Sequence, residues 1–206
     1  MNTAIAKTVE EGNLYDIEEQ VKAALAGGEN PKELLEALMA GLKACGDRFE
    51  TGEFFLPELI AAGEAFTSGM GVLTPKLAAG DRVSQGKVVL GTVHGDVHDI
   101  GKNLVGFMLS SAGFTVVDIG TDVSTEQFVQ AVREEKPNVL GMSALLTTTM
   151  LGMEDVIKEL KKQGLRDKVK VIIGGGPVSK KYCEDIGADG YGNDAAQAVS
   201  LVKGLM

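Results

Sequence analysis

The sequence predicts an α/β protein in which a small helical bundle precedes a doubly wound sheet of five parallel strands. Two observations carry this prediction. Up to about residue 80, apolar residues recur every three or four positions, as they do in amphipathic helices. From residue 87 onward, short apolar runs rich in β-branched residues alternate with helical stretches of about ten to fifteen residues, which is typical of parallel strands joined by crossover helices.

Four helices are expected in the N-terminal part. The first dozen residues supply one, and Asn13 begins a second that ends at the glycine pair 27–28. The segment 30–33, Asn-Pro-Lys-Glu, has an Asn at the N-cap, a Pro at the first helical position and a Glu three residues after the cap, so a third helix begins there. Pro57 opens the fourth.

The segment 77–86 contains turn formers and has no sustained apolar period, so we place the domain boundary inside it. We therefore expect a helical domain of residues 1–82 and an α/β domain of residues 83–206 with a flavodoxin-like or Rossmann-like sheet. Ligands of such sheets bind at the carboxyl ends of the strands. The expected strands are Lys87–Val93, Phe114–Ile119, Asn138–Met142, Val169–Ile173 and Ala188–Gly192.

Composition and charge disfavour several function classes. The 29 acidic residues exceed the 20 basic ones, and a net charge of −9 would repel a phosphate backbone, so no nucleic-acid partner is expected. The sequence has no run of about 18 apolar residues and no secretory signal, so a cytoplasmic protein without membrane contact is expected. Cys45 and Cys183 lack the spacing of a zinc site or a disulfide framework.

Three segments of chemical interest follow the first, third and fourth expected strands. The carboxyl ends of parallel strands lie at one edge of a sheet, so these segments should form one site. The three segments are Gly95-Asp96-Val97-His98-Asp99-Ile100-Gly101, Ser143-Ala144-Leu145-Leu146-Thr147-Thr148-Thr149 and Gly174-Gly175-Gly176-Pro177.

In the first segment, Asp96 precedes His98 by two residues. At this separation the carboxylate can accept a hydrogen bond from one ring nitrogen, which fixes the tautomer and raises the basicity of the other nitrogen. His98 is therefore a candidate metal ligand, although an isolated D-x-H is more often a pair of polar loop residues. His94 forms H-x-x-x-H with His98, but Gly95 and the loop position disfavour zinc, so His94 is expected to face solvent or the rim of a ligand site.

The other two segments have less specific patterns. The glycine run 174–176 lacks the Lys-Ser/Thr of a P-loop, which leaves a turn, or backbone that a flat ligand must touch. One threonine of the run 147–149 is expected to cap the helix that follows, and the remaining hydroxyl groups are then available to a ligand.

Together, the three segments resemble the cobalamin-binding signature D-x-H-x-x-G, S-x-L and G-G. Forty-one residues separate Gly101 from Ser143, and twenty-eight separate Leu145 from Gly174, which are spacings typical of that signature. The string GTVHGDVHDIGKNLV looks like the version found in methionine synthase and in the corrinoid proteins of methanogens and acetogens. A helical half carrying GEFFLP at residues 52–57 extends the resemblance to methyl-transferring corrinoid proteins.

The resemblance implies a corrinoid cofactor, cobalamin or a relative, whose cobalt alternates between methylcobalamin and cob(I)alamin. It implies that His98 is the axial ligand of cobalt and that Asp96 holds the other imidazole nitrogen. Thr149 stands where methionine synthase has a Ser, and it would extend the hydrogen-bond relay.

The same resemblance assigns the remaining cofactor contacts. Ser143 would bond the displaced base of the corrinoid, and residues Gly174, Gly175 and Gly176 would let that base pass close to the backbone. Phe55 is expected over the upper face of the corrin to exclude water, and the alternative is that it packs in the helical core. Further expected contacts are Gly95, Val97, Asp99, Ile100, Gly101, Leu145 and Thr147.

The function implied is a methyl carrier that is not catalytic alone. A donor-specific methyltransferase would methylate cobalt, a second methyltransferase would pass the methyl group to tetrahydrofolate or a thiol, and a reductive activator is a further expected partner. No residue cluster outside the cofactor site could activate a donor, and 206 residues leave no room for a substrate barrel. The alternatives are a B12 sensor or storage protein, which the absence of Trp disfavours, and a flavodoxin-like domain without corrinoid.

Overall fold

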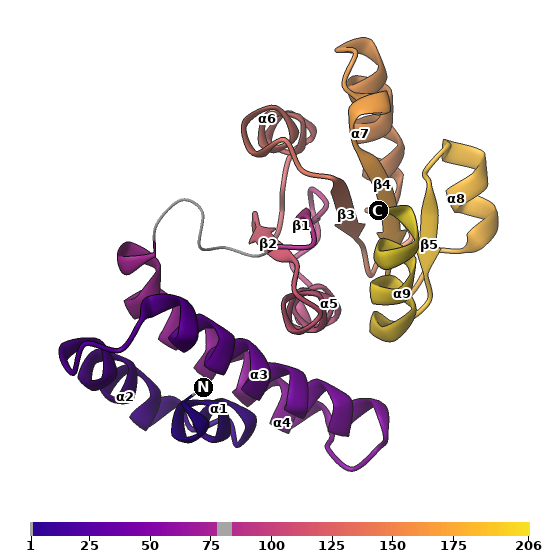
Figure 1. Cartoon of the computed structure of the whole chain (residues 1–206). Helices are drawn as coiled ribbons and strands as arrows, with labels where there is room; N and C mark the ends of the chain where they lie inside the picture. The colour runs from indigo at the N-terminus through magenta and orange to yellow at the C-terminus, as the bar shows by residue number, and fades with distance from the viewer. Residues whose placement is uncertain (1, 78–83) are drawn as a thin grey trace. The chain divides into compact units, whose positions relative to one another are not determined.

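The computed structural model describes residues 2–77 and 84–206. The chain divides into two compact units, one containing helices α1–α4 and the other containing the β-sheet (Figure 1). The expected domain boundary between residues 82 and 83 lies outside the described residues.

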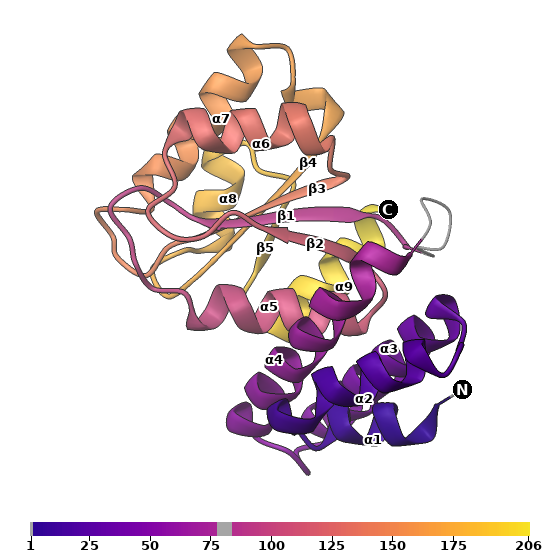
Figure 2. The same cartoon turned by 90° about the vertical axis from the view of Figure 1, so that its left-hand side faces the viewer.

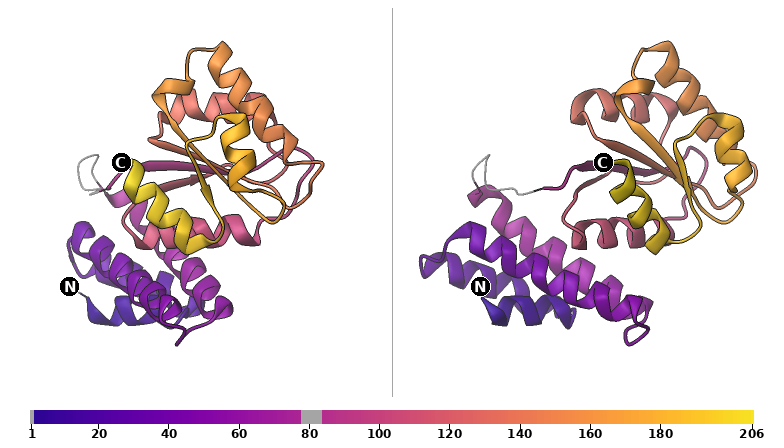
Figure 3. Two further views of the ribbon diagram at one scale, coloured as in Figure 1. Left: turned by 90° about the vertical axis from the view of Figure 1, so that its right-hand side faces the viewer. Right: turned by 45° about the vertical axis from the view of Figure 1, so that its right-hand side comes forward.

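The expected bundle of four N-terminal helices is confirmed, and its helices pack side by side in both views of Figure 3. Three of the helices begin with an Asn whose side chain accepts hydrogen bonds from backbone N–H groups, the first being Asn2, which accepts from Ile5. Asn13 accepts from Tyr15 and Asp16, and Asn30 accepts from Lys32. The helices are α1 (Thr3–Glu10), α2 (Leu14–Ala26), α3 (Pro31–Glu50) and α4 (Leu56–Leu73), and the 3-10 turn η1 (Thr74–Lys76) follows.

The second unit contains the expected five-stranded parallel sheet, with strand order β2-β1-β3-β4-β5 (Figure 1). The interior strands are almost fully buried, as the continuous apolar runs predict. The observed strands start or end one or two residues away from the expected bounds. They are β1 (Lys87–Thr92), β2 (Thr115–Asp118), β3 (Val139–Ser143), β4 (Lys170–Gly174) and β5 (Gly190–Gly192).

Helices cover both faces of this sheet. Figures 2 and 3 show α5 and α9 on one face, and α6, α7 and α8 on the other. Phe128, Leu140 and Met153 are fully buried between the sheet and the second group of helices. The helices are α5 (Ile100–Ser111), α6 (Thr125–Glu135), α7 (Leu151–Lys162), α8 (Lys180–Ile186) and α9 (Ala195–Leu205), with a 3-10 turn η2 (Arg166–Lys168) before β4. In the described part of the chain, no helix combines the length and apolar character needed to cross a membrane.

The strand register brings the three predicted segments to one edge of the sheet. Thr92 at the end of β1 pairs with Ser143 at the end of β3, and Ser143 pairs with Gly174 at the end of β4. The chain order reverses between β1 and β3, so their carboxyl ends flank the topological switch point at which ligands of such sheets bind.

Candidate functional site

Asp96 lies at the centre of the site. Its side chain is fully buried and accepts hydrogen bonds from two loops at once. Oδ1 accepts from the backbone N–H of His98 at 3.1 Å and lies 2.7 Å from its Nδ1. Oδ2 accepts from the backbone N–H groups of Leu145 and Leu146, at 2.8 and 3.4 Å, and from the Thr149 hydroxyl at 2.7 Å. One carboxylate therefore joins the loop after β1 to the loop after β3.

These donors determine the charge of Asp96 and the tautomer of His98. Burial by itself would raise the pKa of Asp96, but hydrogen bonds from Thr149, Leu145 and His98 outweigh it and hold that pKa well below its usual range. Because an ionised carboxylate can only accept, the proton of the neutral His98 ring lies on Nδ1. Its Nε2 therefore keeps a lone pair, and the His98 side chain is 48% exposed.

A buried threonine supports the same loop from beneath. Thr92, the last residue of β1, is fully buried, and its hydroxyl donates to the carbonyl oxygen of His98 at 3.0 Å. The sequence analysis did not single out Thr92, because a threonine at a strand end is unremarkable by itself. This hydrogen bond anchors the backbone at His98 to the end of β1.

The expectation that a threonine of the run 147–149 caps the next helix is wrong. Helix α7 begins at Leu151, and its N-cap is Met150, without a side-chain cap. The Thr149 hydroxyl lies 2.7 Å from Asp96 Oδ2 and 3.0 Å from the Leu146 carbonyl oxygen. The buried carboxylate is the stronger acceptor and draws Thr149 away from the helix terminus. Thr147 is exposed on the same loop.

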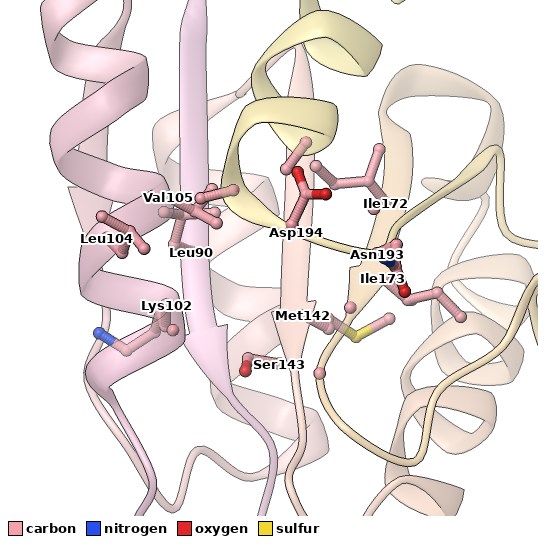
Figure 4. Close-up of a pocket in the computed structure, with 17 residues that line it drawn as sticks. Leu90, Lys102, Leu104, Val105, Met142, Ser143, Ile172, Ile173, Asn193 and Asp194 are labelled. Atoms are coloured by element: carbon pink, nitrogen blue, oxygen red, sulfur yellow. The ribbon is translucent and has the colours of Figure 1, made fainter. Parts of the chain in front are cut away.

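At the same edge of the sheet, a pocket of about 270 Å³ opens between the strand ends, α5 and α9 (Figure 4). Ser143 lines it at the end of β3, and Leu90 and Ile172 form apolar walls. Gly101, Gly174 and Gly175 also line this pocket, whereas Gly176 does not, and a Cβ at Gly176 would lie 3.2 Å from a methyl group of Leu145. Sequence reasoning missed the α9 side of the pocket, residues 193–198, because these residues match no motif of the signature.

Glycine is required at two places beside this pocket. Gly175 has a φ of +115°, and a Cβ there would lie 1.9 Å from the Ala144 carbonyl oxygen. A Cβ at Gly174 would lie 3.0 Å from the carbonyl oxygen of Gly192. Both glycines therefore allow neighbouring backbone segments to approach closely at this edge of the sheet, and they line the pocket with backbone rather than side chain.

The one lysine that borders the pocket in the described chain contributes its aliphatic stem. Lys102 is buried, and Figure 4 shows its ammonium group directed away from the pocket. That group pairs with Asp118 and donates to Asn103 Oδ1. Because its charge is neutralised outside the pocket, Lys102 leaves an apolar wall that suits an uncharged aromatic group.

Large apolar side chains are exposed on the two loops that Asp96 joins. Val97, Ile100 and Leu145, all predicted contacts, are exposed, as are Leu146 and, at the start of α7, Leu151. Exposed large apolar side chains that occur together usually mark a ligand site. The loops that hold the half-exposed His98 ring therefore also present apolar side chains to a ligand.

Other predicted residues shape the ends of this loop. Gly95 has a φ of +78°, and its N–H donates to Asp122 Oδ1 at 2.7 Å. Asp99 precedes α5 and accepts from the backbone and side-chain nitrogens of Asn103, at 2.8 and 3.2 Å. His94, three-quarters exposed, lies with Nδ1 2.7 Å from the same Asp122 oxygen. Asp122 was not predicted, because no residue of the signature lies after the second strand.

Phe55 belongs to the helical unit. It is 67% exposed at the N-terminus of α4, so the alternative that it packs in the core is wrong. Its neighbour Phe54 is partly buried, with the guanidinium of Arg48 4.9 Å from the ring centroid.

Comparison with known proteins covers both units. B12 binding domain families match residues 86–200 and residues 1–74. The chain is 42% identical over 201 residues to trimethylamine corrinoid protein 1 of Methanosarcina acetivorans, covering 94% of this chain and 93% of that one. It is 46% identical over 177 residues to dimethylamine corrinoid protein 3 of the same organism, covering 85% and 83%. The methanol:cobalamin methyltransferase complex of Methanosarcina barkeri contains a similar chain, with a TM-score of 0.86, 35% identity and coverage of 98% and 77%.

Proposed function

Because this chain belongs to the B12-binding corrinoid proteins, we propose that it carries methyl groups on a bound corrinoid between two partner enzymes. The observation that carries this proposal is the His98 imidazole, which the ionised, buried Asp96 holds through Nδ1, so that Nε2 keeps its lone pair at the edge of the sheet where the apolar pocket also opens. A carrier needs a ligand of moderate strength that can bind a metal and release it, and a neutral imidazole meets that need.

The residues present fit a corrinoid. His98 would bind cobalt through Nε2, Ser143 would bond the displaced base, and Gly174 and Gly175 would border that base in the pocket. The exposed apolar side chains of the loops that hold His98 would lie against the macrocycle. When bound, the corrinoid supplies a cobalt centre that accepts a methyl group from a donor and gives it up to an acceptor.

The chain's own contribution is to keep His98 ready for two roles. With Nδ1 donating to Asp96, the neutral ring is a ligand through Nε2. When Nε2 is not bound to metal it can take up a proton, and the carboxylate of Asp96 stabilises the resulting imidazolium. The Thr149 hydroxyl keeps Asp96 charged in both states, so the network can hold or release a proton at His98 without rearranging.

The relatives' names support a methylated amine as the methyl donor. The curated relatives at 42% and 46% identity are trimethylamine and dimethylamine corrinoid proteins, whereas the methanol system is represented at 35%. The proposed partners are therefore a methyltransferase specific for such an amine, a second methyltransferase that serves a thiol or tetrahydrofolate, and a reductive activator. The net charge of −9 would steer the carrier toward basic docking surfaces and keep the free carrier in solution.

A transfer experiment tests the carrier function. Reduced, corrinoid-loaded protein mixed with trimethylamine or dimethylamine alone should show almost no methylation in its visible spectrum. Addition of an amine-specific methyltransferase should give stoichiometric methylation within minutes, because that enzyme supplies the missing donor activation. Repeated turnover from amine to thiol by this chain alone would contradict the carrier function. Failure of amine- and methanol-specific methyltransferases alike to methylate it would favour a B12 sensor or storage protein.

We also propose that Phe55 shields the methyl group of the bound cofactor. An aromatic side chain that is 67% exposed is available to cover an apolar ligand. We expect methylcobalamin bound to Phe55→Ala protein to photolyse about two- to fivefold faster than in the parent, because loss of the ring opens the methyl group to solvent and oxygen. Tyr15, another aromatic residue of the helical unit and 94% exposed, provides the matched control, and Tyr15→Ala should photolyse at the parental rate. If methylcobalamin photolyses in Phe55→Ala at the same rate as in Tyr15→Ala, Phe55 does not cover the methyl group.

A further inference from the structure

The loop that follows β2 contains a residue in an unusual backbone conformation. Asp122 has a φ of +53°, and Lys136 is the other non-glycine residue with positive φ in the described part of the chain. Lys136 ends helix α6, where left-handed residues are common. Asp122 lies in no helix cap, and glycine would take its backbone conformation more readily. The contacts made by the Asp122 side chain explain why an aspartate occupies this position.

Asp122 binds three consecutive residues of the histidine loop. Its Oδ1 accepts a hydrogen bond from the backbone N–H of Gly95 and lies within hydrogen-bond distance of Nδ1 of His94, both at 2.7 Å. Its backbone N–H donates to the carbonyl oxygen of Asp96 at 2.9 Å. Asp122 thus holds the backbone on both sides of the Gly95–Asp96 peptide bond.

The position of Asp122 is itself fixed against β1. The backbone N–H of Val123 donates to the Thr92 carbonyl oxygen at 3.0 Å, and Val123 forms a parallel bridge with Val93. The loop after β2 is therefore an extension of the sheet rather than a free segment. The pKa of Asp122 lies below its usual range, and the largest cause is the hydrogen bond that its carboxylate accepts from Gly95. The side chain is therefore ionised when it holds the loop.

Two supports then fix the segment between β1 and His98 from opposite ends. Thr92 holds the carbonyl oxygen of His98, and Asp122 holds Gly95 and Asp96. Asp96 can orient the imidazole ring only if its own backbone is fixed, because its carboxylate lies two residues before that ring. The support at the start of the loop therefore comes from a residue outside the cobalamin signature.

We propose that Asp122 is a positioning residue for the metal ligand: it clamps residues 94–96, so that Asp96 holds the His98 imidazole in the orientation that binds cobalt. The proposal rests on the proposed role of His98 as that ligand. The loop after β2 then contributes to the cofactor site indirectly. The hydrogen-bond partners of Asp122 in the histidine loop are residues 94–96, and Asp122 acts on His98 through them.

Two substitutions separate the clamp from the backbone conformation. Asp122→Gly keeps the left-handed backbone and removes the carboxylate, so the apoprotein should still fold but should melt slightly below the parental temperature, because the contacts with Gly95 and His94 are lost and glycine gives the unfolded chain more freedom. Its dissociation constant for cobalamin should nevertheless rise about tenfold, in the range found when partners of metal ligands are lost. Asp122→Asn keeps an acceptor oxygen and tolerates the left-handed region, so it should restore most of that affinity.

The measurements are optical titration of each apoprotein with hydroxocobalamin, thermal unfolding, and the histidine-nitrogen splitting of the cobalt(II) signal in electron paramagnetic resonance. Lys136→Gly is the matched control, because it changes the other left-handed residue, and it should bind cobalamin as the parent does. Asp122→Gly with the parental dissociation constant and splitting would overturn the clamp. Parent protein without histidine splitting would refute the ligand role of His98 and the clamp together, whereas Asp122→Gly with both the parental dissociation constant and the parental splitting would refute the clamp alone.

Discussion

Substitution of His98 by alanine is expected to abolish the histidine-nitrogen splitting of cobalt(II) in the loaded protein. His98 is the half-exposed imidazole whose Nδ1 bonds a buried carboxylate, which leaves the lone pair on Nε2. Removal of the ring leaves no nitrogen there to occupy the axial position. The affinity for cobalamin should fall about tenfold or more, because the ligand itself is lost rather than a partner of the ligand.

The chain offers a control for this result, since it contains two histidines. Protein labelled with nitrogen-15 histidine should show the isotope shift in the parent and in His94→Ala, because His94 is three-quarters exposed and bonds Asp122. The shift should vanish only in His98→Ala. Splitting that persists in His98→Ala, or that disappears in His94→Ala, would assign the axial ligand to another group.

The second large effect concerns the stability of the apoprotein. Asp96→Ala should lower the free energy of unfolding by about 3 kcal/mol, because donors from two loops lose a buried charged acceptor. Asp99, a carboxylate in the same loop that accepts from Asn103 near the surface, provides the control. Asp99→Ala should cost about 0.5 kcal/mol or less. Urea unfolding at neutral pH measures both, and equal losses in the two variants would contradict the central role of Asp96.

The contribution of Asp96 should also depend on pH. The folded protein holds the pKa of Asp96 below its usual range, whereas in the unfolded chain the group titrates near its ordinary pKa of about 3.9. The stabilisation is therefore complete above that pH and decreases as pH falls through it toward the folded pKa. The difference in unfolding free energy between parent and Asp96→Ala should stay constant from pH 7 to about pH 5 and narrow below about pH 4. A difference that is unchanged at pH 3 would mean that folding does not lower the pKa of Asp96.

The sequence predicted the architecture because apolar spacing and turn residues are local signals. Asn30 and Pro31 marked a helix start in the right place, and the alternation after residue 87 indicated five parallel strands. The proximity of Asp96 to His98 followed from their separation of two residues. Strand ends were less predictable, because register and bulk packing decide the last residue of a ladder.

The parts of the site that sequence reasoning missed depend on contacts between distant segments. The backbone N–H groups of Leu145 and Leu146 donate to Asp96, about fifty residues away in the sequence. Every residue except proline has such a group, so the residue types do not indicate which N–H will bond the carboxylate. Asp122 carries no motif, and its role depends on a left-handed backbone that its residue type does not reveal. The expected threonine cap of the run 147–149 is missing at α7, because the hydroxyl of Thr149 donates to a buried carboxylate from another loop.

The network around Asp96 has a consequence for the free energy of cofactor binding. Each hydrogen bond that shapes the histidine loop, from Thr92, Leu145, Thr149 and Asp122, comes from the chain itself. A corrinoid that binds would therefore meet a histidine loop that the chain's own hydrogen bonds already order. The free energy of binding would then not be reduced by the cost of ordering that loop, which is the advantage of a preorganised site.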